Sequence, residues 1–161
     1  MTTVDDVPAT GRPSAPDSAG EPLTKEDFEA LARFRSGIRR YLRFSEETVR
    51  NHGVRPQQYQ LMLTLKGFPG RDWAFVRELA DHLQLRHHSV VELIDRAQTQ
   101  GLVRRTSDPD DARAVRVVLT DQGDQLLSRL SALHRDELRR MDTALALPHW
   151  HPSRDSARPQ G

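Results

Sequence analysis

The segment from Phe75 to Thr120 constrains the fold more than any other part of the chain. It reads "FVRELADHLQLRHHSVVELIDRAQTQGLVRRTSDPDDARAVRVVLT". Apolar side chains at three- and four-residue steps predict helices over about 75–83 and 88–100, the second closed by Gly101 as a C-terminal cap. The alternating stretches "LVRRTS" and "AVRVVLT" around "DPDDAR" predict a two-stranded hairpin with a wide tip. Two short helices joined by a tight turn form a helix-turn-helix, whose second helix enters the DNA major groove. The hairpin after it would be a wing.

The two predicted helices divide into an inward apolar face and an outward polar face. Ala80 stands where the first helix must approach the second closely. The inward face of the second helix consists of Val90, Leu93, Ile94 and Ala97. Polar side chains gather at its N-terminal end, which is the end that usually enters the groove. This outward set, which we expect to contact DNA, is Arg86, His87, His88, Ser89, Glu92 and Arg96.

The hairpin tip carries a second candidate DNA contact. Asp111 and Arg113 stand two residues apart, so the carboxylate can brace the guanidinium as it reaches a narrow minor groove, where the potential is most negative. We expect Arg116 on the returning strand to touch phosphate. The alternative interpretation is that the acidic tip is only a solvated turn, with Pro109 and Asp110 present for turn geometry.

Longer helices are predicted on both sides of this segment. Thr24 and Asp27 approximate a capping box that opens a long amphipathic helix, which runs to about Val49. Pro56 can begin a second helix, which stops at "KGFPG". A closing helix from Thr120 repeats apolar positions at helical spacing to a predicted end near Leu147; these positions, with one histidine, are Leu127, Leu130, His134, Leu138, Met141 and Leu145. The predicted fold class is therefore mainly α with a small β-hairpin (α+β).

The two end helices carry more apolar surface than a compact core can use. We expect them to pair with a second copy of the chain; the alternative is that they only wrap the core. Residues 1–22 and 148–161 are poor in large apolar side chains, so we expect a disordered N-terminal tail and a flexible C-terminal tail. Within the second tail, His149-Trp150-His151 is the one feature that could bind a partner.

Composition removes several classes of function. The chain of 161 residues fits one domain, and its 24 basic and 23 acidic residues leave a net charge of +1, so a nucleic acid would have to meet a local basic patch. The absence of cysteine excludes disulfides, thiolate nucleophiles and cysteine-ligated zinc. No apolar run approaches the roughly 18 residues that cross a bilayer, and the first 20 residues are unlike a signal peptide. We expect a cytoplasmic protein without membrane contact.

The stretch "VRELADHLQLRHHSVVELIDRAQTQGLVRRTSDPDDARAVRVVLTDQGDQLL" resembles the winged helix-turn-helix of the MarR family of bacterial transcriptional regulators. The similarity lies in the ordered elements ELA, VxxLxDR, GLVxR, DPxDxR and LTxxG. It implies a homodimeric repressor or activator that binds a palindromic operator on double-stranded DNA. The expected domain spans residues 23–147, with a DNA-binding core over about 55–120 and dimerisation helices over about 24–51 and 121–147.

The resemblance also implies a cleft for a small lipophilic or phenolic effector between the dimerisation and DNA-binding regions. Residues on elements near that cleft are Tyr41, His52, Tyr59 and Trp73, for which core packing is the alternative role. The sequence departs from the family pattern at Arg86, Val91 and Glu92 on the recognition helix, so the operator cannot be borrowed from a relative. Gln84 stands where many such turns have glycine, at a small cost if the position needs positive φ.

Other interpretations of the same residues fit less well. Adjacent histidines on a helix point about 100 degrees apart, so His87 and His88 would not readily share a metal ion. Ser89 near two histidines resembles a catalytic triad only until its groove-facing position is considered. We therefore expect no metal, no cofactor and no catalysis. The main rival function is a winged-helix module that binds protein and not DNA.

Overall fold

The computed structural model describes residues 22–149. The chain follows the order expected from its sequence, with one added strand and one added helical turn. The elements are α1 (Lys25–Asn51), α2 (Pro56–Lys66), β1 (Trp73–Phe75), α3 (Val76–Leu83), α4 (His87–Thr99), β2 (Val103–Ser107), β3 (Val115–Leu119), α5 (Asp121–Arg140) and α6 (Asp142–Leu145). The fold is mainly α with a small antiparallel sheet, as predicted. Most of the two predicted tails, including Trp150 and His151, lies outside the described residues.

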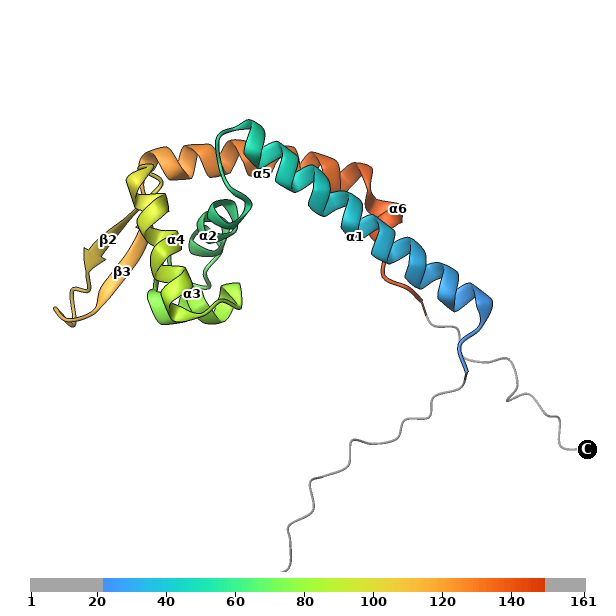
Figure 1. Ribbon diagram of the computed structural model, residues 1–161, viewed down its shortest axis with the longest axis horizontal. Helices are drawn as coiled ribbons and strands as arrows, with labels where there is room; N and C mark the ends of the chain where they lie inside the picture. The colour runs from blue at the N-terminus through green and yellow to red at the C-terminus, as the bar shows by residue number, and fades with distance from the viewer. Residues whose placement is uncertain (1–21, 150–161) are drawn as a thin grey trace, which may run out of the picture.

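Figure 1 shows two regions of different shape. Elements α2, β1, α3, α4, β2 and β3 form a compact body, which we call the winged-helix unit. Helices α1, α5 and α6 lie side by side and extend away from it; we call them the arm. Helix α5 starts directly after β3, so the arm is anchored to the sheet at one end and projects beyond the unit at the other.

The hydrophobic core lies mainly within the winged-helix unit. Most of the largest side chains with almost no exposure come from α2, α3, α4 and the sheet, and include Leu61, Met62, Leu65, Leu79 and Ile94; Val49 of α1 and Leu130 of α5 join them from the arm. All four residues predicted for the inward face of α4 are buried, and Ala80 of α3 is buried beside them. The helical spacing therefore gave the correct face of the second helix.

The sheet has three strands where the sequence predicted two. Strand β3 lies in the centre, paired with β2 through the wing and with β1 on its other edge. In β1, Trp73 lies opposite Val118 and Phe75 opposite Arg116. The prediction of an isolated hairpin was incomplete because β1 has only three residues, too few for a periodic pattern. Its pairing fixes the start of α3 to the base of the wing.

The arm confirms one sequence prediction and corrects another. The capping box of α1 is present: Thr24 Oγ1 accepts the backbone N–H of Asp27 at 3.2 Å, and Asp27 accepts that of Thr24 at 2.8 Å. The single closing helix was wrong, because α5 ends at Arg140 and the chain turns at the buried Met141 into α6. The turn brings α6 against Gly37 of α1, where an added Cβ would lie 2.4 Å from the Ala144 carbonyl oxygen. Only glycine permits this approach.

Candidate nucleic-acid interface

The turn between α3 and α4 has the geometry of a tight helix-turn-helix. Gln84 adopts φ 54°, the one positive φ of a residue other than glycine in the described part of the chain. The N–H of Leu85 then donates to the Ala80 carbonyl at 3.0 Å, which closes α3. The sequence anticipated that this position would favour glycine if φ were positive. The cost of a left-handed glutamine is offset by the packing of the two helices that it joins.

The outer face of α4 presents the residues predicted to read DNA. Arg86 is the N-cap, and Arg86, His87 and His88 are exposed at the start of the helix. Glu92 and Arg96 are also exposed, one turn and two turns further along, and Ser89 is partly covered. The first turn of a helix presents unpaired N–H groups and a positive dipole end to a phosphate. The end of α4 that leads the face is therefore suited to an anionic partner.

Ion pairing separates the cations of this face into two groups. Arg96 lies 3.9 Å from Glu92 on the same helix, so part of its charge is balanced. Within residues 22–149, the side chains of Arg86, His87 and His88 form no hydrogen bond or ion pair. These three side chains have no existing contact that must be broken before they bind. They are therefore the ones most available to a ligand.

Arg105 of β2 ties the wing to α4. Its guanidinium lies 2.7 Å from an Asp95 carboxylate oxygen and donates to Gln98 Oε1 at 3.3 Å. These contacts fix the first wing strand against the second half of α4.

The wing tip is held by carboxylates that bond to the backbone. Asp108 Oδ1 accepts the N–H groups of Asp110 at 2.8 Å and Asp111 at 3.1 Å, and Asp111 Oδ1 accepts that of Arg113 at 2.9 Å. The sequence predicted that Asp111 braces the guanidinium of Arg113, but its carboxylate is bonded to the backbone of that residue. The guanidinium of Arg113 is exposed at the tip. The brace therefore sets the turn and leaves the arginine side chain extended from it.

Arg116, the third predicted wing residue, has an internal environment. Its Nε donates to Asp108 Oδ2 at 2.5 Å, and its guanidinium carbon lies 3.7 Å from the centre of the Trp73 ring. Trp73 also carries the guanidinium of Arg71 at 4.0 Å, and Arg71 in turn bonds to Glu78. We call these five residues, Arg71, Trp73, Glu78, Asp108 and Arg116, the Trp73 cluster. It links the wing base, β1 and the start of α3.

The two carboxylates of the Trp73 cluster are held in their charged form. Burial alone would raise the pKa of Asp108, but the hydrogen bond from Arg116 and the N–H groups of Asp110 and Asp111 outweigh it and lower that pKa. Burial likewise opposes a lowering of the pKa of Glu78, which the Phe75 N–H and Arg71 produce. Glu78 accepts the Phe75 N–H at 2.8 Å and so closes the open end of α3. The cluster is electrostatically satisfied without a ligand.

The four residues predicted for an effector cleft do not all come together. Tyr41 of α1 and Tyr59 of α2 meet around His134 of α5: the Tyr59 and His134 rings stack at 4.5 Å, and Tyr41 makes an edge contact at 6.2 Å. Burial, and then Tyr59, raise the pKa of Tyr41. His52 instead donates from Nδ1 to the Thr48 carbonyl at 2.8 Å, at the end of α1, and Trp73 lies in the sheet.

His134 was predicted only as a position in a helical repeat, but it joins the arm to the winged-helix unit. It is buried, with Nδ1 2.6 Å from the Leu130 carbonyl oxygen and Nε2 2.8 Å from Ser45 Oγ. Since a carbonyl can only accept, Nδ1 carries a proton. The sequence signal for this role was a histidine at an inward position of a leucine repeat. A buried polar ring needs a hydrogen-bond partner, so such a histidine indicates a contact with another element.

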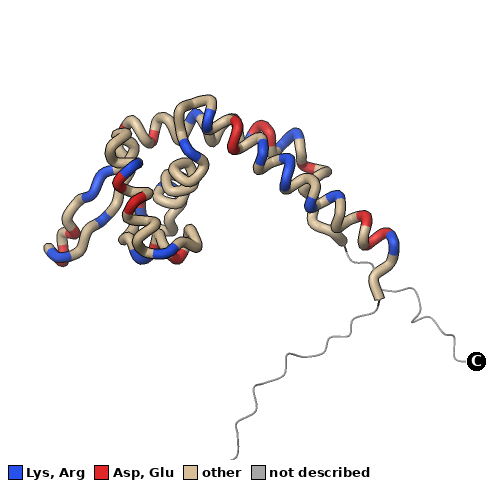
Figure 2. Tube along the Cα trace, in the orientation of Figure 1, with Lys and Arg blue, Asp and Glu red and all other residues tan. Residues whose placement is uncertain are grey.

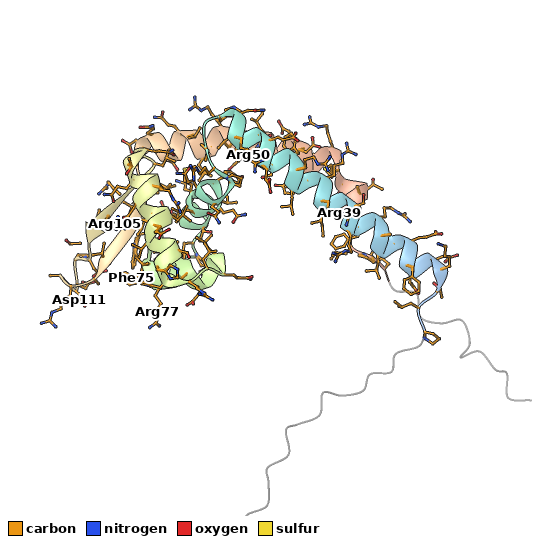
Figure 3. The ribbon with its side chains drawn as sticks, in the orientation of Figure 1. Arg39, Arg50, Phe75, Arg77, Arg105 and Asp111 are labelled. Atoms are coloured by element: carbon orange, nitrogen blue, oxygen red, sulfur yellow. The ribbon has the colours of Figure 1, made fainter. Side chains whose placement is uncertain are left out.

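Arg77 was not singled out from the sequence. It is exposed on the first turn of α3, and Figure 3 shows it at the foot of the unit, on the same side as Asp111 of the wing tip. Figure 2 shows basic positions alternating with acidic ones over this region. The exposed face is therefore of mixed charge and not uniformly basic.

Across residues 22–149, no three histidine, aspartate or glutamate side chains gather in a way that could hold a metal ion. Over the same residues, every helix is too short or too polar to span a bilayer.

A short helix, a left-handed turn, an exposed second helix and a three-stranded sheet with an extended tip define a winged helix-turn-helix protein. Residues 52–114 match the model of the MarR family. The chain is therefore similar to this family over the matched residues. The region that matches covers the turn, α4, β2 and the wing tip, and ends before β3.

Individual proteins are also similar to this chain in sequence or in fold. The chain is similar to YsmB, an uncharacterised HTH-type transcriptional regulator of Bacillus subtilis, at 31% identity over 51% of this chain and 60% of that protein. It spans less than two thirds of that relative. The fold is similar to AbsC, a MarR family transcriptional regulator from Streptomyces coelicolor, with a TM-score of 0.63 and 22% identity over 80% of this chain and 86% of the other. A mutant of MepR from S. aureus, solved bound to an oligodeoxyribonucleotide, gives a TM-score of 0.60 and 18% identity over 74% and 84%.

Proposed function

We propose that this protein is a transcriptional regulator that binds double-stranded DNA in a sequence-specific way. The observation that carries the proposal is the exposed start of α4, where Arg86, His87 and His88 have no partner in the described part of the chain, on a fold shared with a DNA-bound relative. In this mode α4 enters the major groove and Arg113 of the wing tip reaches the adjacent minor groove.

The remaining predicted residues receive different roles within this proposal. His87, His88 and Arg86 would approach base edges or phosphates directly, with Ser89 beside them. Glu92 would accept from a cytosine amino group or reject sequences that place a phosphate or acceptor near it. Arg96 would first have to give up part of its pairing with Glu92. Asp111 would act by shaping the turn that presents Arg113.

A homodimer is part of the proposal, because the arm leaves large apolar side chains in water. Phe28 is 56% exposed, and Leu42, Leu133 and Leu138 are each at least 40% exposed. These side chains lie on the helices that project beyond the winged-helix unit. A second copy of the chain packed against those helices would cover them. Burying apolar area contributes roughly 25 cal/mol per Å². Two units related by a twofold axis would read an inverted repeat with half-sites about one helical turn apart.

The proposal includes release by a small lipophilic or phenolic effector. The layer of Tyr41, Tyr59 and His134 supports it, since this layer joins α1 and α5 of the arm to α2 of the unit. A ligand that displaced one of these rings would change the angle between arm and unit, and so the spacing of the two recognition helices.

The test is selection of duplexes from a random-sequence pool by the full chain, followed by electrophoretic shift at rising salt. We expect an enriched inverted repeat and an affinity that falls steeply with salt, because phosphate contacts release counterions. If no sequence is enriched and no shift is seen at low salt, the proposal is wrong, and the rival function to test is a winged helix that binds protein. Arg86→Ala should then change neither outcome, whereas in a DNA reader it should weaken binding.

A further inference from the structure

Arg116 has a different environment from Arg113 at the wing tip. Its side chain is only 19% exposed, with Nε bonded to Asp108 and one terminal nitrogen 4.0 Å from Asp110. One side of its guanidinium is stacked on Trp73. Arg113, by contrast, is exposed and uses only its backbone N–H within the tip. A phosphate contact by Arg116 would require it to leave an ion pair and an aromatic ring together.

Asp108 connects Arg116 to the tip of the wing. One of its oxygens bonds to Arg116, while the other accepts the N–H groups of Asp110 and Asp111. Asp108 is 7% exposed, which is unusual for a carboxylate on a surface hairpin. The path from Arg116 to Arg113 is therefore continuous: the Asp108 carboxylate, two backbone N–H groups, and the bond from Asp111 to the Arg113 N–H.

Trp73 connects Arg116 to the helix before the recognition helix. Trp73 and Phe75 both belong to β1, which runs directly into α3 at Val76. On the other side of Trp73, Arg71 stacks on the ring and bonds to Glu78, which caps α3 through the Phe75 N–H. Guanidinium groups stacked on tryptophan form one of the stronger cation–π contacts, more so when shielded from water.

We propose that Arg116 is a positioning residue that fixes the wing tip relative to α3, through Trp73 on one side and Asp108 on the other, so that Arg113 is held for the minor groove. The inference rests on the proposed DNA binding. It assigns Arg116 a role in holding the wing in place of a direct contact with phosphate. A wing held in advance avoids the ordering cost that a loose hairpin would incur on binding. Arg116 then acts on DNA only through Arg113.

Asp108→Asn distinguishes a positioning role of Arg116 from a direct phosphate contact, because the two roles predict opposite changes in DNA affinity. Removing a negative charge beside DNA should strengthen binding on electrostatic grounds, and would also release Arg116 to reach phosphate. The positioning role requires the opposite result, because the tip loses the ion pair that anchors it. We expect Asp108→Asn to weaken binding about tenfold, within the range for losing a good groove contact. Tighter binding by Asp108→Asn would overturn the proposal.

A double-mutant cycle of Arg113→Ala and Arg116→Met gives the second readout. If Arg116 acts through Arg113, the double variant should bind about as weakly as either single variant, because each removes the same groove contact. Its salt slope should fall by about 0.9, the value for one phosphate-type contact, and not by twice that amount. Losses that multiply, together with a doubled fall in slope, would show that Arg116 contacts DNA itself.

The probe is the duplex that the wild-type chain enriches from a random pool, so an absence of any enriched duplex is a failure of DNA binding and not of the positioning role. Arg129→Met is the matched control: it removes the same charge from an exposed site on α5 with no ion pair in the described residues. We expect it to bind nearly as wild type does. If Arg116→Met does not fold by circular dichroism, Asp108→Asn and Trp73→Phe, each combined with Arg113→Ala, complete the cycle with the same two outcomes.

Discussion

Arginines beside the sheet of the winged-helix unit and arginines along α1 of the arm have different surroundings. In the unit, Arg71, Arg105 and Arg116 each pair with a carboxylate. On α1 of the arm, a run of exposed arginines has no ion pair within residues 22–149; its members are Arg33, Arg35, Arg39, Arg40 and Arg43. The unit buries most of its large apolar residues, with Leu63 and Val115 as exceptions, whereas the arm exposes Phe28, Leu42, Leu133 and Leu138. The core of the unit is closed within one chain, and we propose that a second copy of the chain covers the exposed apolar side chains of the arm.

The largest expected effect tests the exposed apolar side chains of the arm. Leu42→Asp with Leu138→Asp should convert a dimer to a monomer, since each exposed leucine that becomes buried contributes about 1.5 to 3 kcal/mol and four would be affected per dimer. Sedimentation equilibrium measures the change, and operator binding should be lost with it. Leu63→Asp is the control, because Leu63 is equally exposed at 46% but lies on α2 of the unit. A wild-type monomer would contradict the assignment of the arm.

The next effect tests the buried core of the winged-helix unit. Leu61 is fully buried in the unit, so Leu61→Ala should lower the free energy of unfolding by about 2 to 5 kcal/mol. Leu63→Ala, two positions away on the same helix, should change it by less than about 0.5 kcal/mol. Urea denaturation of both variants provides the comparison. Equal losses would mean that α2 is packed on both faces, against the description of the unit.

The wing tip should give a smaller effect on binding and none on the fold. Arg113→Ala is expected to weaken operator affinity by about 1 to 3 kcal/mol, as for a good groove contact. Its free energy of unfolding should stay near the wild-type value, because the side chain is exposed and its backbone N–H bond to Asp111 survives the substitution. Fluorescence anisotropy with a labelled duplex measures the first quantity. An unchanged affinity would remove Arg113 from the interface.

The smallest expected effect concerns acid stability. The pKa of Asp108 is lowered in the folded protein by Arg116 and two backbone N–H groups, against the effect of burial. Its contribution to stability is therefore complete above its unfolded pKa of about 3.9 and is lost as the pH falls through the lower folded value. Glu78 contributes with the same sign. Between pH 5 and pH 2, Asp108→Asn should lose less stability than wild type in pH-dependent denaturation, while Asp81→Asn, at an exposed site on α3, should follow wild type.

The sequence predicted the parts of the fold that rest on local periodicity. The apolar spacing of Val90, Leu93, Ile94 and Ala97 identified the buried face of α4, and "DPDDAR" located the wing tip. The α5 break at Met141 was missed, because the leucine repeat continues through it and the turn is caused by packing of α6 on Gly37. Strand β1 was missed for a similar reason: three residues carry no pattern until β3 pairs with them.

Side-chain partners were harder to predict than elements. The sequence placed Asp111 and Arg113 together because they are close along the chain, but the ion pair of the wing joins Asp108 to Arg116 across the hairpin. The sequence-based roles of Trp73 and His134 were predicted from their residue type and position in the chain, because their contacts could not be predicted. Their roles depend on strand register and on the crossing of α1 and α5, which bring together residues as distant as Ser45 and His134.

The most direct test of DNA reading by a paired arm is hydroxyl-radical footprinting of the full chain on the duplex that it enriches. Two protected half-sites about one helical turn apart, each with minor-groove protection that disappears in Arg113→Ala, are the predicted result. A single protected half-site would contradict pairing through the arm. Uniform cleavage, at a protein concentration and salt that saturate the shift, would contradict sequence-specific binding by the winged-helix unit.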